Sequence, residues 1–575
     1  MERALGCMRL PDEAAARAVV HAALEAGVTL LDTANVYGPE GAGENERWIA
    51  RALADWTGPR PRVATKGGLT RPGGRWVPDG RAKAIRAACE GSLEALGVDA
   101  IDLYQLHAPD PRTPWKTTCR ALAKLKAEGL VRSIGLCNVS VAQLREAQGH
   151  VEVDAVQIAL SPFEESGLRS GLPQLCRAEG LTLLAHSPFG GPKRAARIGR
   201  HAGLREVAER HGVSPWSVAL AWLEELGAIP LPGCTRPETA AALAGTPSLT
   251  EADRATLDAA FPLGARVREP PVAPSPDTDG EVVLLMGMPG AGKSTLAEPL
   301  LRRGYLRLNR DEVGGTLKKL HRRLDERLGE GARRVVLDNT YGTRALRDQV
   351  IEIAWRHGLP VRCVFVDTPL EEAQINACLR MIARRGRLLE PDEMKRAGKE
   401  DPNLFDPRVQ LRFRDALEPP SEDEGFSALE RIPFARRPFG GDEPAVLVSL
   451  DAFARFDGDA AILDEARAAT LRAEPRLLVA TGWAPKASAA SVEARARSLE
   501  EALERPVDVR LCRHAAGPPI CWCRKPLPGL GVAAILAHGL DPARSLWVGT
   551  SAADRTLAGR LGVPHTEADT YFAAR

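Results

Sequence analysis

One run of residues constrains the fold of this chain more than any other feature. In EVVLLMGMPGAGKST, residues 281–295, an apolar stretch leads directly into a glycine-rich loop. The loop has the spacing Gly287-x-x-x-x-Gly292-Lys293-Ser294. Glycines let backbone N–H groups turn inward around phosphates, so this pattern predicts a strand, a phosphate-binding loop and a helix within an α/β sheet.

The polar residues of the loop predict its ligand. Lys293 would bring an ammonium group to the β- and γ-phosphates, and Ser294 would offer its hydroxyl to Mg²⁺. Gly290 and Thr295 complete the expected nucleotide site. We therefore expect ATP and Mg²⁺ here, against the alternative of a chance glycine turn. The loop does not say which group accepts the phosphate.

The chain is too long for a single hydrophobic core, because 575 residues predict two to four domains. A proline-rich stretch at 268–280 is expected to be a linker, and a second break is expected at 436–444. Apolar runs alternate with helical patterns elsewhere, which favours parallel α/β sheets. The expected units are 1–267, 281–436 and 440–575.

Composition excludes several classes of protein. The net charge of +2 gives no general polycation for nucleic acid or membrane surfaces. We see no apolar run of the ~18–20 residues that a membrane span needs, and no signal peptide, so no membrane contact is expected. The eleven cysteines are mostly scattered singly, which suits a reducing cytoplasm. The oligomeric state stays open.

The stretch GYLRLNRDEVGG, residues 304–315, ends an apolar alternation with Arg310 and Asp311. We expect this second strand to lie beside the first, so that its carboxyl end faces the γ-phosphate. A carboxylate there could take a proton from an attacking hydroxyl, which contributes roughly 10²–10⁴-fold to a rate. The alternative is that Asp311 only caps a helix.

Segments of this region resemble the polynucleotide 5′-kinase domain, most closely that of polynucleotide kinase-phosphatases. They are LNRDEVGGT, VVLDNTYGTRALR, NACLRMIARRGR and EPPSEDEGFSALERIPF. The resemblance implies ATP-dependent phosphorylation of 5′-hydroxyl ends of DNA or RNA, with Asp311 as general base and Arg310 near the acceptor. It also implies that Asp338, Asn339 and Thr340 line the acceptor side.

An arginine cluster in the same region is implied to form a lid over the transferring phosphate. It comprises Arg380, Arg384, Arg385 and Arg387. Phosphoryl transfer depends mainly on positioning and charge neutralisation, which suits such a set. The alternative is a solvated helix face. One departure is Gly314, because the phage enzyme has arginine at this position.

In the first unit, polar residues stand at or just beyond the ends of three apolar runs, where barrel enzymes place their chemistry. They are Asp32, Tyr37, Lys66 and His107. Asp32 would pair with Lys66. The Lys66 ammonium group would lower the pKa of Tyr37, and the imidazole of His107 could orient a carbonyl group.

Residues 1–267 resemble the aldo-keto reductases, (β/α)₈ barrels that use NADPH to reduce a small carbonyl substrate. The resemblance implies the four residues above as a catalytic tetrad. It places Asn138, Gln157, Ser187 and Arg236 around the cofactor. Leu160 stands where a tyrosine usually stacks on nicotinamide, and Cys137 replaces a serine. A barrel kept only as a binding module is the alternative.

The last unit resembles the haloacid-dehalogenase (HAD) phosphatases, a Rossmann-like fold. The resemblance implies nucleophile Asp451, phosphate-binding Thr481, Lys525 and metal ligand Asp554. Phe453 and Thr550 replace two acids of the family pattern, so we expect an impaired phosphatase. Asp457 and Asp459 could substitute, although they stand past the expected strand end.

Four soft ligands gather in the same unit, at Cys512, His514, Cys521 and Cys523. This set meets the requirements of tetrahedral Zn²⁺. A bacterial subgroup of these phosphatases has such a loop before Arg-Lys-Pro, here Arg524-Lys525-Pro526. Packed thiols or a disulfide are the alternatives.

Together these features predict a multidomain α/β enzyme that heals nucleic acid ends. The expected order is a TIM barrel with NADPH, a P-loop kinase with ATP and Mg²⁺, and a HAD-like domain with Zn²⁺. A small-metabolite kinase joined to a carbonyl reductase is the second hypothesis. In a third, the barrel and the last unit are non-catalytic sensing or scaffold modules.

Overall fold

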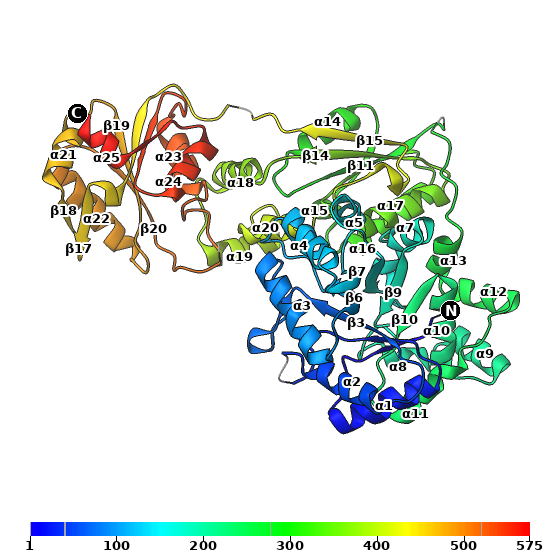
Figure 1. Ribbon diagram of the computed structural model, residues 1–575. Helices are drawn as coiled ribbons and strands as arrows, with labels where there is room; N and C mark the ends of the chain where they lie inside the picture. Colours follow the sequence, from blue (N-terminus) through cyan, green and yellow to red (C-terminus); the bar gives the residue numbers. More distant parts are fainter. Residues whose placement is uncertain (1, 40–41, 277, 437, 519, 575) are drawn as a thin grey trace. The chain divides into compact units, whose positions relative to one another are not determined.

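The computed structural model describes residues 2–39, 42–276, 278–436, 438–518 and 520–574 (Figure 1). It forms two compact units. The first runs to residue 273 and includes 344–349, and the second contains 274–343 and 350–575. Among the described helices, we find none with the length and apolar character needed to cross a membrane.

The first unit is built around eight parallel strands in the order β1-β2-β3-β6-β7-β8-β9-β10. A bridge between Gly6 and Gly233 brings the last strand back to the first. The strands are β1 Ala4–Gly6, β2 Leu30–Asp32, β3 Arg62–Gly67, β6 Ile101–Leu106, β7 Val131–Cys137, β8 Ala155–Ala159, β9 Thr182–His186 and β10 Ala228–Leu231. This arrangement is the expected (β/α)₈ barrel.

Apolar side chains from seven strands fill the barrel interior, among them Leu30, Leu103 and Leu184. Helices surround the strands (Figure 1). They are α1 Glu13–Glu25, α2 Glu44–Ala54, α3 Ala82–Leu96, α4 Trp115–Ala127, α5 Val141–Gln148, α6 Glu165–Leu168, α7 Leu172–Glu179, α8 Ala195–Ile198, α9 Ala202–His211, α10 Pro215–Glu225, α11 Pro237–Ala241, α12 Glu251–Ala260 and α13 Pro262–Arg268. A hairpin of β4 Leu69–Thr70 and β5 Val77–Pro78 lies over the carboxyl ends of the strands, because it directly follows β3.

The second unit begins with a five-stranded parallel sheet in the order β12-β13-β11-β14-β15. Its strands are β11 Glu281–Gly287, β12 Leu306–Leu308, β13 Arg334–Asp338, β14 Val361–Asp367 and β15 Ala428–Pro433. The expectation that the second strand lies beside the first is wrong, because β13 pairs with both and separates them. All carboxyl ends still meet at one edge, since the strands are parallel.

Helices follow these strands, and the last of them form an arm beyond β14. They are α14 Lys293–Arg302, α15 Arg310–Val313, α16 Leu317–Gly329, α17 Arg344–Arg356, α18 Leu370–Arg385, α19 Pro391–Glu400 and α20 Arg408–Ala416. We call residues 370–416, from α18 to α20, the helical arm. Its buried residues Cys378, Met381, Met394 and Leu404 anchor its inner face.

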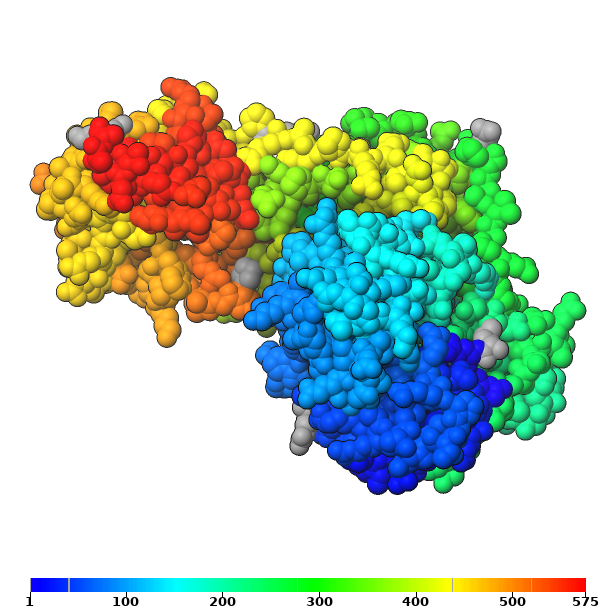
Figure 2. All heavy atoms as spheres, in the orientation of Figure 1, coloured from blue at the N-terminus to red at the C-terminus, as the bar shows by residue number. Residues whose placement is uncertain are grey.

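The rest of the second unit is another five-stranded parallel sheet, ordered β20-β19-β16-β21-β22. Its elements are β16 Ala445–Ser449, hairpin β17 Ala454–Asp457 and β18 Ala460–Leu463, α21 Glu465–Arg472, β19 Leu477–Trp483, α22 Ala489–Leu503, β20 Asp508–Cys512, α23 Gly529–His538, β21 Leu546–Gly549, α24 Ala552–Leu561, β22 His565–Glu567 and α25 Ala568–Ala573. One hydrophobic cluster joins this part to the helical arm. The surface of this part runs from yellow through orange to red in Figure 2.

Candidate active sites

The four predicted residues of the barrel meet at the carboxyl ends of its strands. Lys66 Nζ, on β3, lies 2.5 Å from Asp32 Oδ2 at the end of β2. The Tyr37 hydroxyl lies 3.5 Å from Nε2 of His107, which follows β6. Lys66 Nζ is 5.2 Å from the centre of the Tyr37 ring. The sequence interpretation of this group as a tetrad agrees with its geometry.

Burial controls the protonation of the tetrad. It raises the pKa of Tyr37 to about 12. Lys66 lowers this pKa, as expected, but burial has the larger effect. Burial, followed by the Lys66 charge, lowers the pKa of His107 to about 2. Burial alone would lower the pKa of Lys66, but Asp32 and its neighbours raise it overall. At neutral pH, Tyr37 is therefore a proton donor and His107 is uncharged.

Three of the expected cofactor residues line a cavity of about 680 Å³, which Asp32, Tyr37 and His107 of the tetrad also line. Gln157 donates to Asp32 Oδ1 over 2.8 Å and to Gln105 over 3.2 Å, which leaves its carbonyl oxygen to accept from a carboxamide. Asn138 donates to the backbone oxygen of His107, and Ser187 lies beside it in the lining. These amide and hydroxyl groups fit the amide end of a nicotinamide nucleotide.

Two residues expected near the cofactor lie outside this cavity lining, and their roles stay predictions. Leu160 is fully buried in the barrel core and is not among the residues that line the cavity. His186 is one of the ring-bearing residues that line the cavity, and its Nε2 lies 3.3 Å from Asn138 Oδ1. Arg236 is exposed at the start of α11 and also lies outside the cavity lining.

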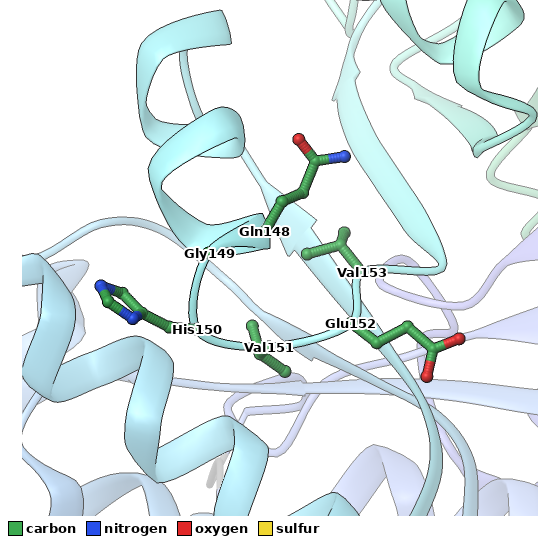
Figure 3. Close-up of a pocket in the computed structure, with 6 residues that line it drawn as sticks. All are labelled: Gln148, Gly149, His150, Val151, Glu152 and Val153. Atoms are coloured by element: carbon green, nitrogen blue, oxygen red, sulfur yellow. The ribbon is translucent and has the colours of Figure 1, made fainter.

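A second depression lies on the barrel surface at residues 148–153 (Figure 3). Its residues form the turn between α5 and the start of β8. The amino ends of parallel strands lie at the face opposite their carboxyl ends, where the tetrad is found. We therefore assign this depression no part in the chemistry.

The phosphate-binding loop of the second unit is shaped as its glycines predict. Gly290 and Gly292 have φ of 88° and 91°, the left-handed region that glycine tolerates. Gly287, with φ of 153°, ends β11, and Thr295 lies in the first turn of α14. Lys293 Nζ donates to the backbone oxygens of Gly287 and Met288, each over 3.0 Å.

One aspartate lies closer to the magnesium side than expected. The Ser294 hydroxyl donates to Asp338 Oδ2 over 3.1 Å, and Asp338 is buried. Arg307, which sequence reasoning missed, donates to the same carboxylate oxygen. A hydroxyl and a carboxylate are the oxygen ligands that Mg²⁺ uses beside phosphates. Asp338 is therefore placed to share a metal ion with Ser294, and its expected place on the acceptor side stays a prediction.

Asp311 faces the same loop and is not a helix cap. Asn309 caps α15 by accepting from the Asp311 backbone N–H, and it donates to the backbone oxygen of Asp338. Burial lowers the pKa of Lys293 to about 8, while the charges of Asp338 and Asp311 oppose that shift. The Asp311 carboxylate therefore lies within electrostatic reach of Lys293.

The two other residues expected on the acceptor side bond to the start of α15 and to the end of β11. Asn339 Oδ1 accepts from the backbone N–H of Arg310 over 3.2 Å. The Nδ2 atom of Asn339 is buried and finds no partner among the residues that the structure describes. The backbone oxygen of Thr340 accepts from Gly287 over 3.4 Å.

The arginine cluster divides into different roles. Arg380 is mostly buried, and its Nε and Nη2 atoms have no partner within the described part of the chain. Burial, followed by the charge of Arg384, lowers the pKa of Arg380, while the charges of Asp401 and Asp311 oppose that shift. Arg384 pairs with Asp401 and Arg387 with Glu393, while Arg385 is exposed. Of these four arginines, Arg380 alone is mostly buried and has guanidinium nitrogens without a partner among the described residues, so it is suited to bind an anion.

Asn403 connects Arg380 to Asp311, which the sequence did not indicate. Its Oδ1 accepts from Arg380 Nη1 over 3.0 Å, and its Nδ2 donates to Asp311 Oδ2 over 3.4 Å. It belongs to the loop between α19 and α20 and lies 92 positions from Asp311. We found no motif that would have singled it out.

The polar groups of the C-terminal sheet converge on Ser449, which sequence reasoning also missed. Lys525 Nζ lies 2.6 Å from Asp554 Oδ1 and donates to the Ser449 hydroxyl over 2.8 Å. Ser449 ends β16 and pairs in register with Thr481, whose hydroxyl oxygen is buried without a partner in the described residues. The sequence could have indicated Ser449, because it is a polar residue directly after the apolar run AVLV.

Asp451 lies one turn further on, away from this contact. It is exposed and accepts from the Thr550 hydroxyl over 2.7 Å. Phe453 is buried in the hydrophobic core. Asp459 bonds to Arg495, and Asp457 ends β17, so neither takes the place of a missing acid at Lys525. Burial raises the pKa of Asp554, but the charge and hydrogen bond of Lys525 lower it. The net pKa of Asp554 is about 2.

The four expected zinc ligands lie together. Their donor atoms are all within 4.8 Å of one another. Cys512 Sγ is 3.9 Å from Cys521 Sγ, 3.4 Å from Cys523 Sγ and 3.6 Å from His514 Nδ1. Ligands ~2.3 Å from a tetrahedral zinc ion lie about 3.8 Å apart, so the group fits Zn²⁺.

Two family models match parts of this chain. Residues 4–261 match the Aldo/keto reductase family, and residues 282–387 match an AAA domain. Similar solved structures include glycerol dehydrogenase AKR11B4 from Gluconobacter oxydans, with 26% identity over 47% of this chain and 94% of that chain, TM-score 0.40. Another is an aldo-keto reductase from Klebsiella pneumoniae in complex with NADPH, with 22% identity over 45% of this chain and 90% of that chain, TM-score 0.39. The chain therefore carries an aldo/keto reductase domain followed by a P-loop kinase-like domain.

Proposed function

We propose that the chain joins two enzymes. The barrel is an NADPH-dependent reductase of a small carbonyl compound. The second unit transfers the γ-phosphate of ATP to the 5′-hydroxyl end of DNA or RNA. The observation that carries the kinase assignment is the group of Lys293, Asp311 and the mostly buried guanidinium of Arg380, two of whose nitrogens have no partner among the described residues.

This group suits phosphoryl transfer to a hydroxyl. Lys293 and Arg380 would neutralise the oxygens of the γ-phosphate, while Ser294 and Asp338 would hold Mg²⁺ beside it. Asp311 would accept the proton of the attacking hydroxyl as the new P–O bond forms and the bond to ADP breaks. Asn403 would keep the carboxylate and the guanidinium at a fixed separation.

The choice of a polynucleotide acceptor depends on the resemblance of the segments from LNRDEVGGT to EGFSALERIPF. Arg310 supports it, because its side chain is 44% exposed and lies 3.7 Å from Asp311. An exposed guanidinium beside the base is suited to a phosphate of the acceptor strand. DNA and RNA ends share that phosphate, so both are candidates.

In the barrel, the residues fit reduction of a carbonyl group. NADPH held by Asn138, Gln157 and Ser187 would supply a hydride to the carbonyl carbon. Tyr37 would donate its hydroxyl proton to the carbonyl oxygen, and neutral His107 would orient that oxygen. Lys66, held by Asp32, would stabilise the phenolate that remains.

For residues 440–575 we propose an impaired HAD-like phosphatase with a structural zinc loop. A hydroxyl, that of Ser449, stands where Lys525 and Asp554 meet. A neutral hydroxyl that donates to a carboxylate is a poor nucleophile and a weak metal ligand. Thr481 and Lys525 would still be able to hold a phosphate group without cleaving it.

Labelled phosphate transfer tests the acceptor. The purified chain is incubated with γ-labelled ATP, Mg²⁺ and matched DNA or RNA oligonucleotides with 5′-hydroxyl ends. Oligonucleotides with 5′-phosphate ends are the control. We expect label on the hydroxyl ends alone. If only sugars or sugar acids accept phosphate, and oligonucleotides do not compete, the chain is a small-metabolite kinase and the polynucleotide assignment is wrong.

A further inference from the structure

The loop that contains the Cys/His cluster also contacts the helical arm. Trp522 lies between ligands Cys521 and Cys523, and its side chain is almost completely buried. Its indole N–H donates to the backbone oxygen of Phe405 over 2.9 Å. The two rings meet edge to face at 6.2 Å. The metal-binding loop is therefore anchored in the helical arm.

A second link runs through the histidine ligand. His514 Nδ1 faces the sulfur atoms, and Nε2 lies 2.6 Å from Glu390 Oε2 of the helical arm. Arg513 donates to the other oxygen of Glu390 over 2.8 Å. A carboxylate on the second ring nitrogen fixes which nitrogen faces a metal. Glu390 also caps α19, so the start of that helix is tied to the ligand.

The anchored part of the arm is the segment that holds the kinase residues. Within residues 401–405, Asp401 pairs with Arg384, and Asn403 bonds both Arg380 and Asp311. The Phe405 ring lies 5.6 Å from the Arg380 guanidinium. Residues 401–405 thus form a short support with the cluster on one side and the phosphate site on the other.

We propose that the Cys/His loop sets the position of this support, and that a zinc ion in the cluster is what keeps the loop in place. Trp522 and Asn403 are then positioning residues for phosphoryl transfer. Zinc fixes loops that lack a core of their own, because its ligands close the chain on a rigid centre. The inference depends on the proposed kinase function for its effect on rate, but not for its effect on structure.

Hydrogen exchange tests the structural part without any acceptor. The full chain is compared with its Zn²⁺ loaded and after chelation, and zinc content is measured in each sample. We expect one zinc per chain, and amide exchange in residues 401–405 that rises about tenfold or more on removal. A chain that binds no zinc, or that loses zinc with unchanged exchange there, would overturn the inference.

A matched pair of variants tests the link itself. Trp522→Phe keeps a ring but removes the N–H that reaches Phe405. Trp547→Phe makes the same change at another fully buried indole in the same cluster, whose nitrogen has no partner in the described residues. We expect Trp522→Phe alone to raise exchange in residues 401–405 while zinc content stays unchanged. Equal effects of the two changes would refute a specific link.

Kinetics separate this inference from the proposed function. Trp522→Phe and Asn403→Ala should lower kcat for phosphoryl transfer about tenfold with little change in KM for ATP, because the P-loop is untouched. NADPH-dependent reduction by the same molecules should be unchanged. A uniform loss of both activities would mean misfolding and would contradict the link. If hydrogen exchange in residues 401–405 rises as expected but no oligonucleotide is phosphorylated, the proposed acceptor is wrong. The structural link between the Cys/His loop and residues 401–405 would still hold.

Discussion

Changing Tyr37 to phenylalanine removes one hydroxyl group from the reductase site and little else. The ring packs edge-on against Trp76 at 6.3 Å and against His107 at 5.6 Å, and phenylalanine keeps both contacts. The ion pair of Lys66 with Asp32 does not involve the hydroxyl. The variant should therefore fold normally and bind NADPH with unchanged affinity.

The expected loss follows from the single role of the hydroxyl. A positioned proton donor contributes roughly 10²–10⁴-fold, which is about 2.7–5.4 kcal/mol of activation free energy. Because burial raises the pKa of Tyr37 to about 12, the wild-type residue stays protonated between pH 6 and pH 9. The deficit of Tyr37→Phe should therefore be constant across that range, since the missing proton is present at each pH in the wild type.

The assay follows NADPH oxidation with a broad panel of aldehydes, and NADPH binding is measured by fluorescence. Tyr104→Phe is the matched control, because it removes a buried hydroxyl that bonds to Ile85 instead of facing the cavity. We expect only Tyr37→Phe to lose turnover. A variant that keeps more than about a tenth of the wild-type rate would refute the role of Tyr37. A wild-type barrel that binds NADPH without any turnover would favour a sensing module.

Two other outcomes follow from buried charges. Lys66→Met leaves the Asp32 carboxylate buried without its cation and should destabilise the barrel by about 3–5 kcal/mol, with most of the loss recovered in Lys66→Met/Asp32→Asn. Urea unfolding measures this, and an unchanged midpoint would contradict it. Lys293 has its pKa lowered to about 8 by burial, so it is mostly neutral at pH 9 and charged at pH 7. ATP phosphates favour the ammonium, so binding should take up ~0.9 proton at pH 9 and very little at pH 7. Calorimetry in buffers of different ionisation enthalpy measures the uptake, and equal uptake at both pH values would show that Lys293 is not the group involved.

Strand ends made the tetrad and the nucleotide loop predictable. Asp32, Lys66 and His107 each stand at or just past the end of an apolar run, and parallel strands bring such ends to one edge. The glycine spacing before Lys293 likewise predicts the backbone conformation of the loop, because Gly290 and Gly292 adopt positive φ angles. In both cases the local sequence, together with the regular order of strands and helices, was sufficient to predict the site.

Other features depend on packing that sequence periodicity does not encode. In the order β12-β13-β11, β12 pairs with β13 and not with β11, and nothing in the residues of β12, Leu306–Leu308, specifies that pairing. The pKa of Tyr37 rises because burial outweighs Lys66, and burial depends on the whole barrel. Asn403 reaches Asp311 from a loop 92 positions away.

The most direct test of the account is single-turnover phosphoryl transfer by Asp311→Asn. The enzyme is loaded with labelled ATP and Mg²⁺ and mixed with a 5′-hydroxyl oligonucleotide, with Asp325→Asn on the surface of α16 as the control. The account predicts that Asp311→Asn binds ATP as tightly as the wild type but transfers phosphate roughly 10²–10⁴-fold more slowly. Transfer at the wild-type rate would contradict it, because the carboxylate at position 311 would then not be the base.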